Sequence, residues 1–191
     1  MKTIYSLQTT SEPTFVCTYI KQTKKHGQFD LCDGSRTIAT LPNAGGTSVI
    51  SETLSFEMLN RMYAAKLQAT EMELRYYPLG SKITDYSVSI YGETIGVSVT
   101  RAMKFKGIFT DEDGVRLLTK KLDGVICSSK AVIKQYRWKK QILHIWAETK
   151  DTAKVLERVY FSDAIPQSLK SSTIVMVSVW ENAPFVFYDR V

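Results

Sequence analysis

Residues 83–103, ITDYSVSIYGETIGVSVTRAM, decide the fold that we expect for this chain of 191 residues. Apolar and polar side chains alternate on both sides of Gly92 and Glu93, a pattern typical of β-strands with one buried face. Glycine beside a polar residue, placed between two such runs, favours a tight turn. The stretch therefore predicts an antiparallel hairpin whose second strand is TIGVSVTRAM.

A helix and a further strand are expected before this hairpin. Residues 47–67, TSVISETLSFEMLNRMYAAKL, carry apolar side chains every four positions, and Thr47 or Ser48 can cap the resulting helix. Residues 69–77, ATEMELRYY, alternate between apolar and polar and predict a strand. The hairpin thus completes a three-stranded antiparallel meander that follows a helix.

Helices and strands are expected to alternate after the hairpin. The pattern predicts a helix over 110–135, a strand over 141–148, a helix over 149–163, a strand over 171–180 and an edge segment over 182–191. Because a strand–helix–strand connection within one sheet joins parallel strands, the later strands pair in parallel. We therefore expect an α/β fold in which a mixed central sheet is flanked by helices.

The first 45 residues are expected to form an N-terminal β appendage. TFVCTYI (14–20) and FDLCD (29–33) are apolar or alternating runs, separated by KQTKKHGQ and followed by the turn-forming stretch LPNAGG. The chain is thus predicted to divide into an appendage over 1–45 and an α/β domain over 46–191.

Positive charge is concentrated in one part of the chain. The net charge is +6, and the stretch from Arg101 to Gln141 holds eleven lysines and arginines against four acidic residues. Such a local surplus of seven favours binding to a polyanion, since each neutralised phosphate releases a counterion. DNA or RNA is therefore the expected partner; the alternative is a solvated face that keeps the protein soluble.

The order of elements resembles the core of the restriction-endonuclease-like PD-(D/E)XK superfamily. Asp85 opens the second meander strand, where that superfamily carries a metal-binding Asp. Thirteen residues later, Ser98-Val99-Thr100 occupies the place of the acid-x-Lys pair. The resemblance covers residues 47–150 and rests on element order and one spacing. It implies a nuclease-like fold.

The replacements at Ser98 and Thr100 imply a degenerate catalytic site. The helix could still supply Glu52 or Glu57, and the first strand Glu73. If the site is active, Asp85 and Glu52 are the expected ligands of Mg²⁺; otherwise no cofactor is expected. Arg101 points to the opposite face of the strand if Ser98 and Thr100 face the site. Two interpretations remain: a protein that binds nucleic acid without cutting it, and a metal-dependent nuclease with migrated residues.

The segment KAVIKQYRWKKQ, residues 130–141, looks most like a binding surface. Its cations suit a phosphate backbone, and Trp138 either stacks on an unpaired base or packs into the core. The residues expected to contact nucleic acid are Arg101, Lys104, Lys130, Lys134, Arg137, Trp138, Lys139 and Lys140.

Several other classes of site are excluded by the residues available. Two histidines and three cysteines, with neither a C-x-x-C nor an H-x-x-x-H motif, argue against a structural zinc site and a Ser/His/Asp hydrolase. His144 is interpreted as a hydrogen-bonded strand residue. No signal peptide or apolar run of membrane length is recognised, so we expect an intracellular protein, cytoplasmic or nuclear. The alternative function is a non-catalytic protein-interaction or scaffolding module.

Overall fold

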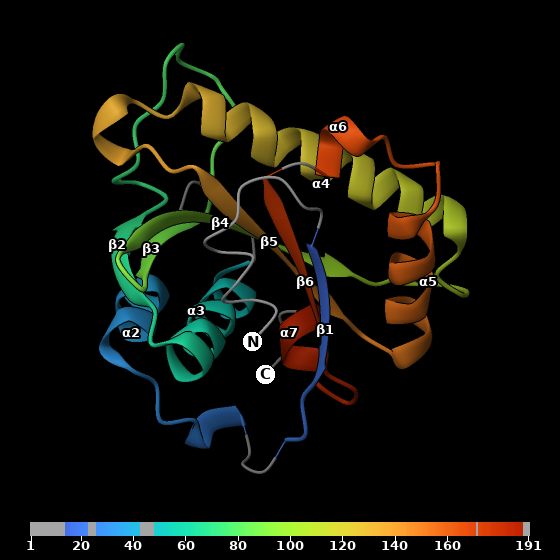
Figure 1. The fold of residues 1–191 in the computed structure, drawn as a ribbon. Helices are drawn as coiled ribbons and strands as arrows, with labels where there is room; N and C mark the ends of the chain where they lie inside the picture. Colours follow the sequence, from blue (N-terminus) through green and yellow to red (C-terminus); the bar gives the residue numbers. More distant parts are fainter. Residues whose placement is uncertain (1–13, 23–25, 43–47, 171, 189–191) are drawn as a thin grey trace.

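A six-stranded mixed sheet forms the centre of the computed structural model, which describes residues 14–22, 26–42, 48–170 and 172–188 (Figure 1). The strands are β1 (Thr14–Tyr19), β2 (Lys66–Thr70), β3 (Tyr86–Ile90), β4 (Glu93–Ala102), β5 (Lys140–Ala147) and β6 (Thr173–Val179). Their order is β1-β6-β5-β4-β3-β2, with an antiparallel β2-β3-β4 meander and parallel pairing from β4 to β1. The predicted mixed α/β architecture is confirmed.

Helices cover both faces of the sheet (Figure 1). They are α2 (Asp33–Thr40), α3 (Val49–Tyr63), α4 (Asp111–Ala131), α5 (Lys150–Phe161), α6 (Gln167–Lys170) and α7 (Pro184–Phe187), with short 3₁₀ segments η1 (His26–Gln28) and η2 (Lys134–Tyr136). One face packs against α2, α3 and α7, and the other against α4, α5 and α6. Within the described ranges, none of the helices combines the length and apolarity that a membrane crossing requires.

Alternation along β5 and β6 places their side chains in two separate cores. Ile142 and Trp146 pack in the cluster of the α3 face, whereas Leu143 and Ile145 pack in the cluster under α4 and α5. Every residue of β5 is buried, because a parallel sheet covered on both faces leaves no side of the strand exposed.

The start of α4 carries a Thr-x-x-Asp sequence that forms a capping box. Thr110 Oγ1 accepts a hydrogen bond from the Asp113 N–H, and Asp113 Oδ2 accepts one from the Thr110 N–H. Lys104 and Arg116 also pair with this carboxylate. The hydrogen bond from Lys104 is the main cause that lowers the pKa of Asp113 to about 2. The helix therefore begins at a capping box held by two cations.

Three local predictions are corrected. FDLCD is not a strand, because the chain enters helix α2 at Asp33. The strand expected over 69–77 lies earlier: β2 ends at Thr70, where Glu73 accepts hydrogen bonds from the Thr70 N–H and Oγ1 and turns the chain. The described part of the expected edge segment at 182–191 contains the helix α7 instead, with Pro184 in its first turn.

The strand predicted at residues 14–20 exists, and it belongs to the main sheet. β1 pairs in parallel with β6, from Thr14 beside Ile174 to Tyr19 beside Val179. What was expected to be an appendage thus supplies an edge strand of the central sheet. The expected boundary near residue 45 lies outside the described residues, and the division into two domains stays a prediction.

Candidate functional site at the edge of the meander

Asp85 lies where the meander leaves one edge of β4 open. β3 begins at Tyr86, opposite Val97, so the remainder of β4 pairs with β5 alone. At this point Asp85 Oδ2 accepts a hydrogen bond of 2.5 Å from the backbone N–H of Val99. The carboxylate thus takes the place of a strand neighbour for one backbone donor.

A pocket of about 290 Å³ opens beside this carboxylate. Asp85 and Ser98 both line it, and α4 supplies Lys120 and Lys121. Its remaining lining residues are Lys82, Ile83, Val99, Asp123, Gly124 and Val125. The pocket therefore combines two carboxylates, those of Asp85 and Asp123, with three lysines.

Burial is the largest cause that raises the pKa of Asp85, to about 7, and the charge of Glu52 adds to it. The Val99 N–H and Lys121 act in the opposite direction. Glu52 is itself buried on α3, and this burial raises its pKa, while Arg101 and Lys121 oppose the rise. Burial lowers the pKa of Lys121. The fold thus wholly or partly buries three ionisable groups, which lowers the stability of the protein when they are charged. Such shifted pKa values are characteristic of functional sites.

Asp85→Asn is expected to stabilise the protein by about 2 kcal/mol at about pH 8. The folded pKa of about 7 exceeds the ordinary value of 3.8, so this group's contribution to stability is complete below about pH 4 and is lost as the pH rises through 7. The amide keeps an acceptor for the Val99 N–H and carries no charge. The full pKa shift of Asp85 corresponds to about 4 kcal/mol of folding free energy. We expect a smaller effect because the side chain is partly in contact with solvent.

Urea unfolding of the variant and the wild type at about pH 4 and about pH 8 measures this effect. Asp123→Asn, which neutralises the exposed carboxylate of the same pocket, is the matched control and should change the stability little. An equal stability difference at both pH values for Asp85→Asn would contradict the raised pKa.

The structure does not bring every predicted residue to this pocket. Ser98 and Thr100 share the face of β4 that looks toward α4, since Val97 and Val99 pack in the α3 cluster. Thr100 does not line the pocket, and Glu52 approaches Asp85 from the α3 side of the sheet. Glu73 instead accepts hydrogen bonds from Thr70 at the end of β2.

Glu57 and Arg101 serve contacts elsewhere. Glu57 accepts hydrogen bonds from the Cys32 N–H, Ser35 Oγ and Arg61 Nε, and so ties α2 to α3. Arg101 lies on the face of β4 opposite Ser98, as alternation predicts, and its Nη1 donates to the carbonyls of Val186 and Phe187 at 3.5 and 3.3 Å.

The carboxylates present do not fit a Mg²⁺ site. Mg²⁺ requires several ionised oxygen ligands in octahedral geometry. Asp85 already accepts a hydrogen bond from the Val99 N–H, and the positive charge of Lys121 lies close enough to lower its pKa. Among the described residues, no three His, Cys, Asp or Glu side chains are grouped in a way that could hold a metal.

Two of the expected nucleic-acid contacts are buried, and a third, Lys104, is exposed but held in an ion pair. Trp138 is 5% exposed and packs against Gly96, with Ala69, Leu74 and Val132 in the same cluster. It therefore cannot stack on a base. Lys140 is buried at the start of β5, and burial lowers its pKa. Lys104 pairs with Asp113 at 2.6 Å.

The other cations of this segment lie on the surface. Lys130, Lys134, Arg137 and Lys139 are exposed at the end of α4 and in the turn that leads into β5. They remain available to contact a partner.

Four binding candidates were missed from the sequence. Lys120 and Lys121 were considered only as part of the positive charge of residues 101–141, and no binding role was predicted for them. Leu118 and Leu122 mark the buried side of α4, and this places Lys121 near the sheet. Lys82 and Tyr77 lie on the loop between β2 and β3, with Tyr77 80% exposed. The helical period could have revealed Lys121, but the loop gave no comparable signal.

Comparisons with known proteins reveal a close similarity to one curated protein. No protein-family model matches the chain. The AAC-rich mRNA clone AAC4 protein of Dictyostelium discoideum is 44% identical over 167 residues, which is 83% of this chain and 24% of that protein. The chain thus spans about a quarter of the length of the curated relative that it matches.

A solved structure, Pyrococcus furiosus SfsA in complex with Ca²⁺, aligns with 70% of this chain and 55% of its own at 11% identity. The TM-score is 0.35. An alignment this weak does not place site residues, and the assignment of the pocket rests on its own geometry.

Proposed function

We propose that the protein binds nucleic acid across the Asp85 pocket and the exposed end of α4, and that its altered nuclease-like site does not cut the bound strand. The observation that carries this proposal is the convergence of Lys82, Lys120 and Lys121 on one concave site. A cluster of cations at a pocket attracts phosphate groups, and the low-dielectric walls strengthen that attraction.

Exposed cations further along α4 and beyond its end would extend this surface. Lys130 on α4 and Lys134, Arg137 and Lys139 beyond its end add further positive charge. Tyr77 is exposed on the loop that also carries Lys82, so an unpaired base has an aromatic ring on which to stack. Single-stranded nucleic acid is therefore favoured over a duplex.

Cleavage in the presence of Mg²⁺ is expected to be absent, on both single-stranded and double-stranded substrates. Ser98 and Thr100 replace the acid-x-Lys pair of the superfamily that the chain resembles, so the site offers fewer anionic ligands to Mg²⁺ and no lysine at that position. Incubation of labelled DNA and RNA with Mg²⁺ or Mn²⁺ tests this expectation. Cleavage that disappears in Asp85→Ala would show that the catalytic residues have migrated.

The salt dependence of binding is expected to report on the exposed cations. If Lys130, Lys134, Arg137 and Lys139 each contact one phosphate, replacing all four with Gln should reduce the slope of log K against log salt by about three to four units. Fluorescence anisotropy with single-stranded and duplex probes, at several salt concentrations, measures the slope.

Arg36→Gln and Lys154→Gln together form the matched control. Both cations are exposed and pair with an acid three residues earlier on their own helix, outside the pocket. An unchanged slope in the four-fold variant, with the fold intact, would mean that the basic end of α4 is only a solvated face.

A second function, docking to a protein, is favoured by the exposed loop between β4 and α4. Phe105 and Ile108 are 82% and 83% exposed there, and large apolar side chains at such positions are common in interaction sites. Absence of any nucleic-acid affinity at low salt would favour this alternative.

A further inference from the structure

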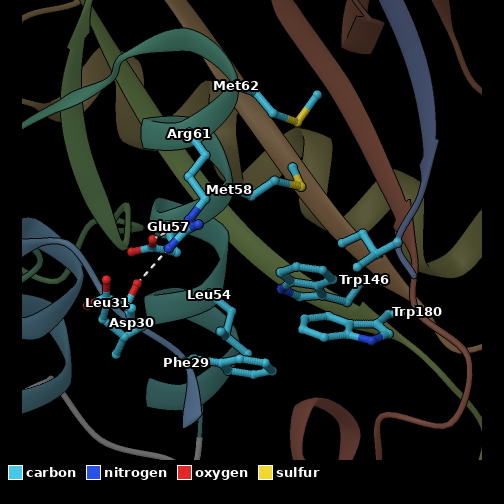
Figure 2. Close-up of a pocket in the computed structure, with 11 residues that line it drawn as sticks. Phe29, Asp30, Leu31, Leu54, Glu57, Met58, Arg61, Met62, Trp146 and Trp180 are labelled. Carbon is cyan, nitrogen blue, oxygen red and sulfur yellow. Dashed lines mark hydrogen bonds and ion pairs between the residues drawn. The ribbon is translucent and has the colours of Figure 1, made fainter. Parts of the chain in front are cut away.

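A second, mostly apolar cavity lies on the other face of the sheet, between α3 and the segment that precedes α2 (Figure 2). Its volume is about 330 Å³. Trp146 and Trp180 are almost fully buried beneath it, whereas Met62 is half exposed at its mouth. The cavity is distinct from the Asp85 pocket, so a ligand bound there would give the protein a function beyond the proposed binding of nucleic acid.

Aromatic rings and thioethers make up five of the eleven lining residues. Phe29 and Trp180 have centroids 5.9 Å apart and planes tilted by 41°, and Trp146 and Trp180 lie 5.8 Å apart and are tilted by 44°. Met58 and Met62 lie in another part of the lining (Figure 2). Tilted rings and sulfur atoms make favourable contacts with a further aromatic ring. Because ligand pockets span about 300–1,000 Å³, this one suits a molecule of one or two rings.

One edge of the cavity carries two carboxylates, those of Asp30 and Glu57, and the guanidinium group of Arg61. Arg61 donates from Nε to Glu57 and from Nη2 to the carbonyl of Asp30, both at 2.6 Å. Hydrogen bonds from Ser35, Cys32 and Arg61 lower the pKa of Glu57 despite its burial, so this carboxylate is ionised. The edge therefore has a net charge of about −1 at neutral pH, with Asp30 exposed to solvent.

We propose that this cavity binds a small aromatic amine, with its ring among the indoles and methionines and its ammonium group toward Asp30. The acidic edge attracts the ammonium group, whereas the indoles and thioethers contact the ring of the ligand. A carboxylate of equal size would meet Arg61, but it would also be repelled by Asp30 and Glu57. The cavity thus selects for a cation on an apolar body.

Two probes that differ only in charge test the proposal. Phenethylammonium and 3-phenylpropionate carry the same ring on chains of similar length. The indole N–H signals of Trp146 and Trp180 in ¹H–¹⁵N spectra report binding, and Trp138, on the other face of the sheet, is the internal reference. The amine is expected to shift the two cavity signals with about tenfold higher affinity than the acid.

Asp30→Asn is expected to lower the affinity for phenethylammonium about threefold or more, because the uncompensated charge is removed. Asp33→Asn, which neutralises an exposed carboxylate outside the cavity, should leave it unchanged. Equal or tighter binding of 3-phenylpropionate, or no shift with either probe at millimolar concentration, would overturn the proposal. A shift of Trp138 equal to that of Trp146 would overturn it as well, because binding would then not be confined to the cavity.

Discussion

His144→Ala is expected to destabilise the protein by about 3–5 kcal/mol. The imidazole is fully buried, with Nδ1 2.7 Å from Ser55 Oγ and Nε2 2.9 Å from Ser178 Oγ. Tyr86 extends this chain through Ser55, and Thr18 extends it through Ser178. Removing the ring leaves a cavity and interrupts a hydrogen-bonded chain that crosses the sheet from β3 to β1.

A comparison of the pH dependence of stability between the wild type and His144→Ala separates the effect of this histidine from that of the other titratable groups. Burial lowers the pKa of His144 from 6.5 to about 3, so its contribution is complete above about pH 6.5 and is lost as the pH falls toward 3. Between about pH 7.5 and about pH 5, the wild type should lose about 2 kcal/mol more than His144→Ala does. Urea unfolding at both pH values measures the difference, and parallel pH profiles would contradict it.

Trp138→Ala is expected to cost about 3–5 kcal/mol of stability, with no separate effect on nucleic-acid binding. The indole fills the space above Gly96, and a Cβ at Gly96 would lie 2.4 Å from the ring. Thermal melts run beside anisotropy titrations separate the two effects. A variant that melts like the wild type but binds single strands weakly would show that Trp138 stacks on a base.

Two further variants sharpen the test of Trp138. Trp138→Phe keeps an aromatic ring in the cluster and should cost less than the alanine variant. The methyl group of Gly96→Ala would clash with the indole ring of Trp138, so we expect this variant to destabilise the protein by about 1–3 kcal/mol. A neutral Gly96→Ala variant would mean that the indole moves away from β4 without cost.

The helices α3, α4 and α5 and the strands β3 to β6 could be predicted because each carries a strong local signal. Period-two alternation marked β3 and β4, and the Thr110–Asp113 capping box marked α4. Errors occurred where a tertiary contact decides the structure. Glu73 ends β2 by accepting hydrogen bonds from Thr70, and Glu57 binds the first turn of α2, so the apolar run FDLCD did not form a strand.

The candidate site was predictable only in part, for a related reason. Asp85 and Ser98 were brought together because strand spacing and alternation are regular. Lys82 and Lys121 reach the same pocket from a loop and from α4, and their placement depends on how those elements pack. Trp138 could be either core or surface from its sequence context, and the absence of a side chain at Gly96 decided the outcome.

The place of β1 at the edge of the sheet has a consequence for how the protein folds. Thr18 contacts Ser178 across 160 residues of chain, so β1 can pair only after β6 has been synthesised. From the synthesis of β6 until β1 pairs with it, the edge of β6 is open to another strand. The β1 strand of a second molecule offers the same register, and two chains that exchange this strand would keep every β1–β6 contact. Crowded or rapid refolding should therefore give strand-swapped dimers before it gives disordered aggregates.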